Sequence, residues 1–429
     1  MNICQTACII EFSHTNYLEA VQMFNDLIMN AMPSLVKFFE LLRLKIYFTN
    51  PQLRHLKGFV VSMMLKGYSG KITDVAELAL HAHRSCVSRF LDSDSWNCTY
   101  LLHAIRKYTI DTIWQAARRT RKPIYVIFDD TICEKAIPSS KVISPIYGCG
   151  FYRSHLKNKT VYGQQFVGCM LRVGDLVLPY DIVLYEKAVD DKTPARSKIS
   201  IVEDLIKSLP SPPHGGFVVT DSWYSCKALF DASSKAGYHF IGGLKCNRLV
   251  FPRGYRKKGI KISKFAQSLK PSDFDFVTVG EHKYYVYTYL GKINGQRKVK
   301  IIITYPMGAF GNVRALKAFI TTDIQMNPSQ LIAHYMKRWP IEVFFRESNR
   351  YLGMKTAQVR SKKSVTRYQY VLMLAFAFCG MNVSGGKVVL GIQRRKHRQA
   401  IEKFKITWAY KHGQMNTAIS DVLVAFKIA

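Results

Sequence analysis

The alternation of hydrophobic and polar positions divides the chain into a helical first part and a later part with both strands and helices. Residues 75–79 carry one apolar stripe at helical spacing, and residues 87–91 carry a second after a short break. Two short amphipathic helices in this order predict a helix-turn-helix over residues 72–92. Its second helix would present Arg84 and Arg89 outward, which suits contact with phosphates and guanine edges. Two ordinary packing helices are the alternative.

Short apolar runs rich in β-branched residues mark the second part. Residues 124–128 and Gly216–Thr220 are apolar almost throughout, which is typical of strands buried on both faces of a sheet. Further strand-like and helical stretches alternate around these runs, and this alternation predicts an α/β core. The strand-like stretches are 161–172, 176–185 and 238–241, and the helical ones are 197–209 and 225–236.

A β-rich, basic segment interrupts this alternation at residues 244–325. An alternating stretch within it contains Asn294-Gly295, a type I′ turn signal, and so predicts a hairpin. Asn327-Pro328 then opens another helix. The predicted organisation is a helical domain at 1–120, an α/β core at 121–243 and 326–380, a β-rich insertion at 244–325 and a basic region at 381–429.

The charge of the chain narrows the class of partner. Lys and Arg number 62 against 29 Asp and Glu, a net charge of +33 at pH 7. A chain this basic repels itself unless it meets a polyanion, and we expect nucleic acid. An anionic membrane or a merely solvated surface is the alternative. No apolar run approaches the ~20 residues that span a bilayer, and the first ten residues lack the basic region of a signal peptide. The ten cysteines are scattered without a CxxC, which fits a reducing cytoplasm.

Three acidic residues stand at the predicted strand ends and in a late helix. Asp130 follows the strand at 124–128, Asp221 follows Gly216–Thr220, and Glu342 lies in the late helical segment. Carboxylates at the ends of core strands converge at one rim of a sheet, and three of them would repel one another unless cations intervened. Oxygen ligands favour Mg²⁺ or Mn²⁺, and two such ions about 4 Å apart support phosphoryl transfer. Taken singly, each acid is equally a turn or cap residue.

The late helical segment carries a polar face. Tyr335, Arg338, Glu342 and Asn349 follow one another at spacings of 3, 4 and 7, so they fall along one side of a helix. A phenol, a guanidinium, a carboxylate and an amide on one face suit the binding of a phosphate backbone beside a metal site. Pro340 is expected to start a new helix, which would place Tyr335 and Arg338 before a kink.

These residues resemble a known signature. The chain resembles the DDE transposases of bacterial insertion sequences, in the branch (the insertion sequence four superfamily) marked by Y-x2-R-x3-E-x6-K. Glu342 occupies the acidic position of the signature here, and Asn349 stands where the family has Lys. The segments FDDT around Asp130 and VTDSWY around Asp221 resemble the first and second acidic motifs. The resemblance runs from about residue 70 to residue 380.

The resemblance implies a fold and an activity. It implies a ribonuclease-H-like mixed sheet in which Asp130, Asp221 and Glu342 hold two divalent ions, Mg²⁺ or Mn²⁺. The implied reaction is DNA cleavage at the transposon ends followed by strand transfer into target DNA. The implied partners are double-stranded DNA and a second copy of the chain, in the cytoplasm of a bacterium at the nucleoid. The helical domain would bind the ends, and the segment 244–325 would be the β-rich insertion of such enzymes.

The resemblance also assigns DNA contacts beside the acids. Tyr335 and Arg338 are expected to grip DNA near the cleaved strand. Asn349 keeps a hydrogen-bond donor and loses the charge of the family lysine, and Arg346 or Arg350 would compensate. A choice also arises at the first acid, because adjacent residues of a strand point to opposite faces. The family places the acid directly before Thr, which favours Asp130 over Asp129.

Basic and aromatic residues elsewhere are candidates for DNA binding. Lys and Arg side chains that neutralise phosphates give affinity independent of sequence, and Trp339 would either stack on an unpaired base or belong to the core. The basic candidates in the insertion are Arg253, Arg256, Lys257 and Lys258. The rival interpretations are a related nuclease without strand transfer, a DNA-binding protein that has lost catalysis, and an RNA-processing enzyme.

Overall fold

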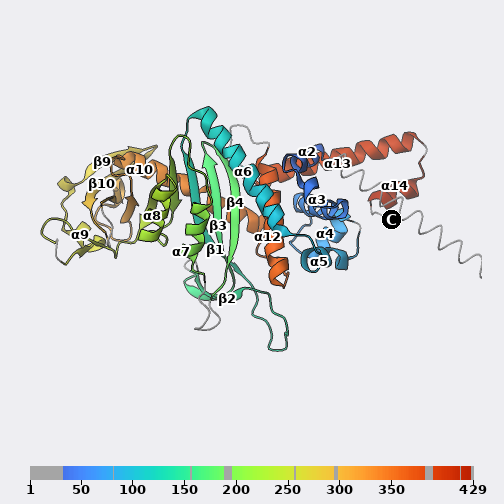
Figure 1. Cartoon of the computed structure of the whole chain (residues 1–429), viewed down its shortest axis with the longest axis horizontal. Helices are drawn as coiled ribbons and strands as arrows, with labels where there is room; N and C mark the ends of the chain where they lie inside the picture. The colour runs from blue at the N-terminus through green and yellow to red at the C-terminus, as the bar shows by residue number, and fades with distance from the viewer. Residues whose placement is uncertain are drawn as a thin grey trace, which may run out of the picture. The chain divides into compact units, whose positions relative to one another are not determined.

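The computed structural model (Figure 1) contains two compact units. The sheet-containing unit spans residues 109–346, and the helical unit combines the chain before residue 109 with the chain from Glu347 onward. The long helix α6 (Cys98–Thr120) and helix α11 (Pro340–Tyr351) each contain a point of division. The structure describes residues 32–80, 82–154, 157–187, 196–255, 258–293, 298–381, 390–415 and 417–426.

A mixed sheet forms the centre of the sheet-containing unit. Within the described residues ten strands follow the order β2-β3-β1-β5-β6-β12-β11-β10-β9, with β4 paired to β3. Strand β1 runs parallel to β5 and antiparallel to β3, and β5 runs parallel to β6. The strands are β1 (Ile124–Glu134), β2 (Cys149–Ser154), β3 (Lys159–Val173), β4 (Leu176–Tyr185), β5 (Gly216–Thr220), β6 (His239–Leu244), β9 (Asp275–Val279), β10 (His282–Gly291), β11 (Val299–Pro306) and β12 (Lys317–Thr321).

The apolar runs of the sequence are the middle of this sheet. The first five residues of β1 are all buried, and Ile127 pairs in register with Val219 of β5. A strand with apolar side chains on both faces needs cover on both faces. Helix α7 (Lys198–Lys207) and helix α10 (Pro328–Tyr335) supply it, because they contact side chains of opposite parity on β1. The α/β fold class is confirmed, with the expected ribonuclease-H-like mixed core.

The β-rich segment at 244–325 continues this sheet. Strand β12 pairs antiparallel with β6, and β11, β10 and β9 follow outward from it. Strands β10 and β11 form the hairpin that the alternation predicts, whereas its turn residues Asn294 and Gly295 lie outside the described residues. A short pair, β7 (Leu249–Val250) and β8 (Ile260–Lys261), and helix α9 (Ile262–Ser268) precede these strands.

The late helical segment is broken as Pro340 predicts. Helix α10 starts at Pro328 behind the capping box of Asn327 and Gln330. A 3-10 turn, η5 (Met336–Arg338), follows it, and α11 begins at Pro340. Proline lacks an N–H group, so it fits the first position of a helix. Arg338 therefore stands in the turn between two helices.

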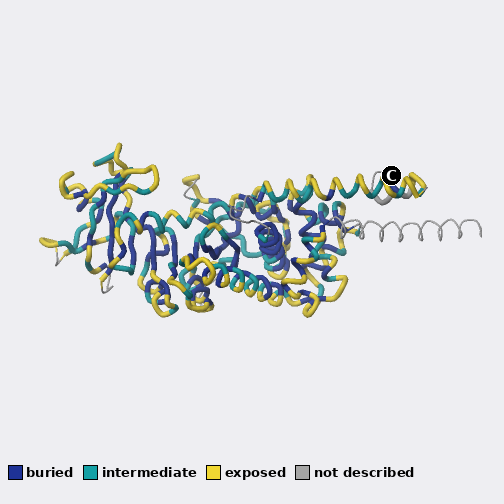
Figure 2. Tube along the Cα trace, turned by 90° about the horizontal axis from the view of Figure 1, so that it is seen from above, coloured by how far each residue is buried: buried dark blue, intermediate teal, exposed yellow. Residues whose placement is uncertain are grey.

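The helical unit is built around α12 (Lys362–Gly380), which is buried along most of its length. The predicted helix pair consists of α4 (Ile72–Val75), the π-helical turn η2 (Ala76–Leu80) and α5 (Arg84–Asp92). Figure 2 shows α12 in dark blue and how little of α13 (Leu390–Gln414) is buried. The other helices are α2 (Pro33–Leu41), α3 (Asn50–Met64) and α14 (Ile419–Phe426). In the described residues no helix is long and apolar enough to cross a bilayer.

A buried arginine explains why α12 packs with the N-terminal helices, although the sequence places it in the core at 326–380. The Arg367 guanidinium donates to the carbonyls of Phe90 at 2.9 Å, Leu91 at 3.1 Å and Asp94 at 2.7 Å, and also to that of Trp96. It lies 4.2 Å from the Trp96 ring centroid. Phe90 and Leu91 belong to the last turn of α5, where carbonyls have no intrahelical donors, and Asp94 and Trp96 follow the helix. Arg367 therefore ties α12 to the end of α5 and to the segment after it.

The substitution Arg367→Leu is expected to destabilise the helical unit. Buried carbonyls lose charge-assisted bonds, which costs about 3 kcal/mol or more. Thermal unfolding followed by circular dichroism should show a lower midpoint. The matched control is Lys363→Leu, which changes an exposed cation of the same helix. Equal midpoints for the two variants would contradict this role for Arg367.

Candidate active site

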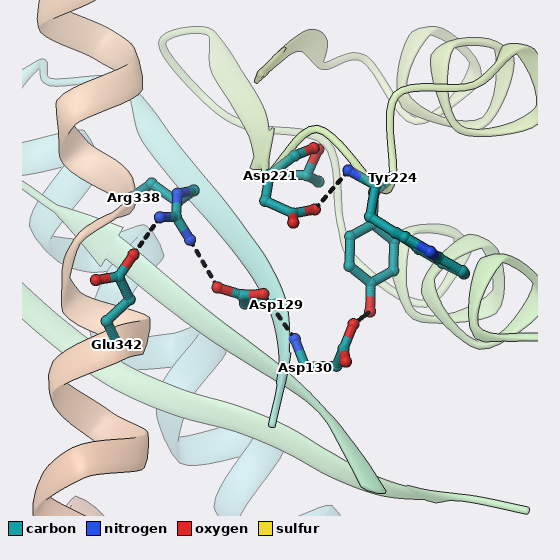
Figure 3. Close-up of polar contacts among 8 residues, drawn as sticks. Asp129, Asp130, Asp221, Tyr224, Arg338 and Glu342 are labelled. Carbon is teal, nitrogen blue, oxygen red and sulfur yellow. Dashed lines mark hydrogen bonds and ion pairs between the residues drawn. The ribbon is translucent and has the colours of Figure 1, made fainter. Parts of the chain in front are cut away.

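Three elements bring acidic side chains to one region of the sheet-containing unit (Figure 3). Strand β1 supplies Asp129 and Asp130, the turn after β5 supplies Asp221, and the first turn of α11 supplies Glu342. The sequence predicts that the first strand ends before the acids, but β1 runs on to Glu134, so Asp129 and Asp130 lie within it, just past the residues that pair with β5. Asp221 follows the end of the parallel neighbour β5, which places it at the same level of the sheet.

Arg338 links two of these acids. Its Nη1 donates to Asp129 Oδ2 at 2.6 Å, and its Nη2 donates to Glu342 Oε1. The Arg338 side chain is 14% exposed, so this contact is largely shielded from solvent. Tyr335 lies beside it, with its ring centroid 5.8 Å from the guanidinium carbon. One internal cation therefore neutralises an acid of β1 and an acid of α11.

Asp130 has a different set of partners. Its Oδ1 accepts from Lys198 Nζ at 3.0 Å and from Tyr224 Oη at 2.8 Å, and its Oδ2 accepts from Gln165 Nε2. The side chains of the two adjacent aspartates thus point to opposite faces of the sheet, as the alternation along a strand requires. Arg338 links Glu342 to Asp129, whereas Asp130 meets Lys198 of α7. The choice of Asp130 over Asp129 stays a prediction, and the geometry gives Asp129 an equal claim.

Negative charge accumulates at this edge. The pKa of the Asp129 carboxyl is raised to about 7, chiefly by burial; Arg338 lowers it, and the nearby Asp221 and Asp130 contribute to the rise. Burial likewise raises the pKa of Asp221, with a contribution from Asp130. The backbone N–H of Trp223, which donates to Asp221 Oδ1 at 2.9 Å, the backbone of Tyr224 and the charge of Arg338 lower the pKa of Asp221, but they do not offset burial. The raised pKa values indicate a site that favours additional positive charge.

The chemistry of these donors fits a divalent cation. Carboxylate oxygens are the ligands that Mg²⁺ and Mn²⁺ prefer. Among the described residues, however, no three Cys, His, Asp or Glu side chains lie close enough together to hold one ion. Asp129 and Glu342 are engaged by Arg338, and Asp130 by Lys198. A metal held by these acids would replace internal cations as their partners.

Residues near the acids differ in exposure. Trp339 is 56% exposed, so it does not belong to the core, and stacking remains the open alternative. Arg346 is exposed at the end of this unit. Asn349 and Arg350 follow on α11 but belong to the helical unit. The position of these two residues relative to the acids is therefore not described.

The other DNA-binding candidates lie apart from the acids along the chain. Arg84 and Arg89 are exposed on α5 and line a cavity of about 590 Å³ together with Lys71, Ser85 and Ser88. Such a cavity combines three cations with two hydroxyls. In the insertion Arg253 and Lys258 are exposed, whereas Arg256 and Lys257 lie outside the described residues.

Lys198, Gln165 and Tyr224 are part of the site and were missed as site residues in the sequence. Tyr224 ends the DSWY segment and is fully buried, so its position after Asp221 was the one available signal. Lys198 and Gln165 lie 68 and 35 residues from Asp130. No local pattern marks residues that meet only through the fold.

Comparisons with known proteins match the chain to two families. The family described as "DDE superfamily endonuclease" matches residues 43–259, and the family described as "Transposase DDE domain" matches residues 178–378. The cryo-EM structure of the piggyBac transposase synaptic complex with hairpin DNA is similar with a TM-score of 0.47 and 11% identity, over 90% of this chain and 80% of that chain. No curated protein sequence matches.

The substitution Asp129→Asn is expected to stabilise the protein more at high pH than at low pH. The Asp129 pKa is about 7 in the folded protein against an ordinary 3.8, so folding disfavours the ionised form. The free energy of unfolding is therefore lowered by an amount that grows from about pH 4 to pH 7 and stays constant at higher pH. Removing the charge should therefore add about 1–4 kcal/mol at pH 8 and little at pH 4.

Thermal unfolding with a chelator at pH 4, 6 and 8 measures this difference. Asp231→Asn is the control, because Asp231 pairs with Lys227 at the surface. A gain at pH 8 no larger than the gain at pH 4 would contradict the raised pKa.

Proposed function

The chain belongs to the DDE superfamily of endonucleases, and we propose that it is a transposase that cuts DNA at the ends of a mobile element and joins them to target DNA. DDE endonuclease domains generally depend on divalent metal. The observation that carries the proposal is that Asp129, Asp130 and Asp221 lie close together in a largely buried place; burial, with a contribution from the other two acids, raises the Asp129 pKa to about 7.

The acids of this edge have a role that suits such a reaction. Asp221, Glu342 and an aspartate of β1, Asp130 or Asp129, would hold two Mg²⁺ or Mn²⁺ ions. Bound metal supplies an activated water and stabilises the leaving oxygen of a phosphodiester. In the first step water cuts the strand, and in the second the freed 3′-hydroxyl attacks target DNA.

The cationic and aromatic residues around the acids would bind the DNA strand. Arg338 and Tyr335 lie in contact distance of each other, and a phosphate could replace a carboxylate as partner of the guanidinium. The signature formed by Tyr335, Arg338 and Glu342 supports the insertion-sequence branch, with Asn349 as the departure. The net charge of +33 supports extensive contact with duplex DNA. A second copy of the chain would be needed to cut both ends.

The substitution Asp221→Asn tests the proposed chemistry. Neutralising this acid should lower Mg²⁺-dependent cleavage of DNA that carries the element ends by about a thousandfold or more, the effect of losing about 4 kcal/mol of charge stabilisation. Binding of the same DNA should be retained, which a filter-binding or mobility-shift assay checks. Cleavage at the wild-type rate would end the metal-site proposal.

The same experiment separates the alternative functions. A nuclease without strand transfer would cut the ends and give no joined product. A DNA-binding derivative that has lost catalysis would bind the ends and cut nothing with either metal. The metal-ligand acids are all present in the chain, which supports the active enzyme.

The cations that line the cavity beside α5 lead to a separate prediction about DNA affinity. Arg84→Ala should reduce the slope of log K against log salt concentration by about 1, because each phosphate contact releases about one counterion. Lys66→Ala is the matched control, since Lys66 is an exposed cation of the same unit outside this cavity. Equal slopes for both variants and the wild type would show that the α5 face does not touch phosphates.

A further inference from the structure

Lys198 is the first residue of α7 and points into the site rather than into solvent. Its side chain is 11% exposed, although lysine side chains usually extend into water. The ammonium lies 3.0 Å from Asp130 Oδ1 and 3.9 Å from the Trp223 ring centroid. An aromatic face and a carboxylate together compensate a buried ammonium. The fold therefore holds a positive charge against Asp130.

The other two partners of Asp130 are neutral. The Tyr224 hydroxyl donates to the same oxygen as Lys198, and the Gln165 amide donates to the second oxygen. Neutral donors fix the orientation of a carboxylate and remain compatible with a metal ion beside it. A lysine ammonium repels a divalent ion at this range. Lys198 thus differs from Tyr224 and Gln165 in what it does to a metal.

We propose that Lys198 is a built-in competitor of the divalent metal for Asp130, which DNA relieves. This inference rests on the proposed function, with Asp130 as the aspartate of β1 that binds the metal beside Asp221, whose pKa it raises. In the free protein the ammonium neutralises Asp130 and weakens metal binding. When a DNA phosphate enters, it offers Lys198 a second anion, and the ammonium moves along the ring of Trp223, which is 39% exposed. DNA binding and metal binding therefore favour each other through Lys198.

Calorimetric titration of the full chain with Mn²⁺, with no DNA present, tests whether Lys198 weakens metal binding. Lys198→Met keeps the length of the side chain and removes its charge, and it should bind Mn²⁺ about tenfold more tightly than the wild type. Tyr224→Phe should change the affinity in the opposite direction, because it removes an orienting donor. Lys227→Met is the matched control and should change nothing, since Lys227 also begins a helix, α8 (Lys227–Lys235), but pairs with the half-exposed Asp231.

Repeating the titration with a DNA duplex in which a methylene group replaces the 3′ bridging oxygen of the linkages, so that they keep their charge and are not cleaved, tests whether DNA relieves this competition. DNA should tighten Mn²⁺ binding by the wild type by about tenfold, and should tighten it much less in Lys198→Met. The inference is overturned if Lys198→Met binds Mn²⁺ no more tightly than the wild type, or if DNA acts equally on both. Should Lys198→Met not fold, Lys198→Gln makes the same comparison.

Asp221→Asn separates a failure of this inference from a failure of the proposed function. If Mn²⁺ binding by Asp221→Asn equals that of the wild type, the acids do not form the metal site and the proposed function itself fails. If Asp221→Asn weakens Mn²⁺ binding while Lys198→Met leaves it unchanged, only the role of Lys198 is wrong.

Discussion

The repulsion among acids at the edge of β1 and β5 is the constraint on which the site depends. Burial is the largest cause that raises the pKa of Asp129 and of Asp221; Asp130 raises the pKa of both, and Asp221 also raises that of Asp129. Such a cluster is stable only if positive charge stands among the acids. Two internal cations from different elements supply this charge: Arg338 pairs with Asp129, and Lys198 pairs with Asp130.

The alternation of side chains along β1 explains why two cations are needed. Asp129 points toward α10 and α11, where Arg338 also reaches Glu342, and Asp130 points toward α7. One strand thereby presents acid to both faces of the sheet. The turn η5 matters for the first face, because the break at Pro340 places Arg338 between two helices rather than within one.

The sequence predicts the parts of this site that follow local rules. The runs at 124–128 and Gly216–Thr220 are buried in strands, and Pro340 begins a helix, as their patterns indicate. The end of the first strand was predicted wrongly, because β1 continues through Asp129 and Asp130 to Glu134. The contacts of Lys198 and Gln165 with Asp130 were not predictable, because they join residues that no local pattern relates. The packing of α12 was also only partly predictable. Its apolar sequence predicts that it is buried, but the contact of Arg367 with the end of α5, which shows what it packs against, is seen only in the structure.

Internal cations also set a balance between stability and metal affinity. A site that gathered its acids without Arg338 and Lys198 would bind a divalent ion more strongly but would leave buried charges unpaired in the free protein. Pairing each acid with a side-chain cation stabilises the fold and weakens metal binding by the same interaction. In the function that we propose, DNA would resolve the conflict, because its phosphates would bind guanidinium and ammonium groups and leave the carboxylates to the metal. A nuclease arranged in this way would bind metal most strongly when its substrate is present.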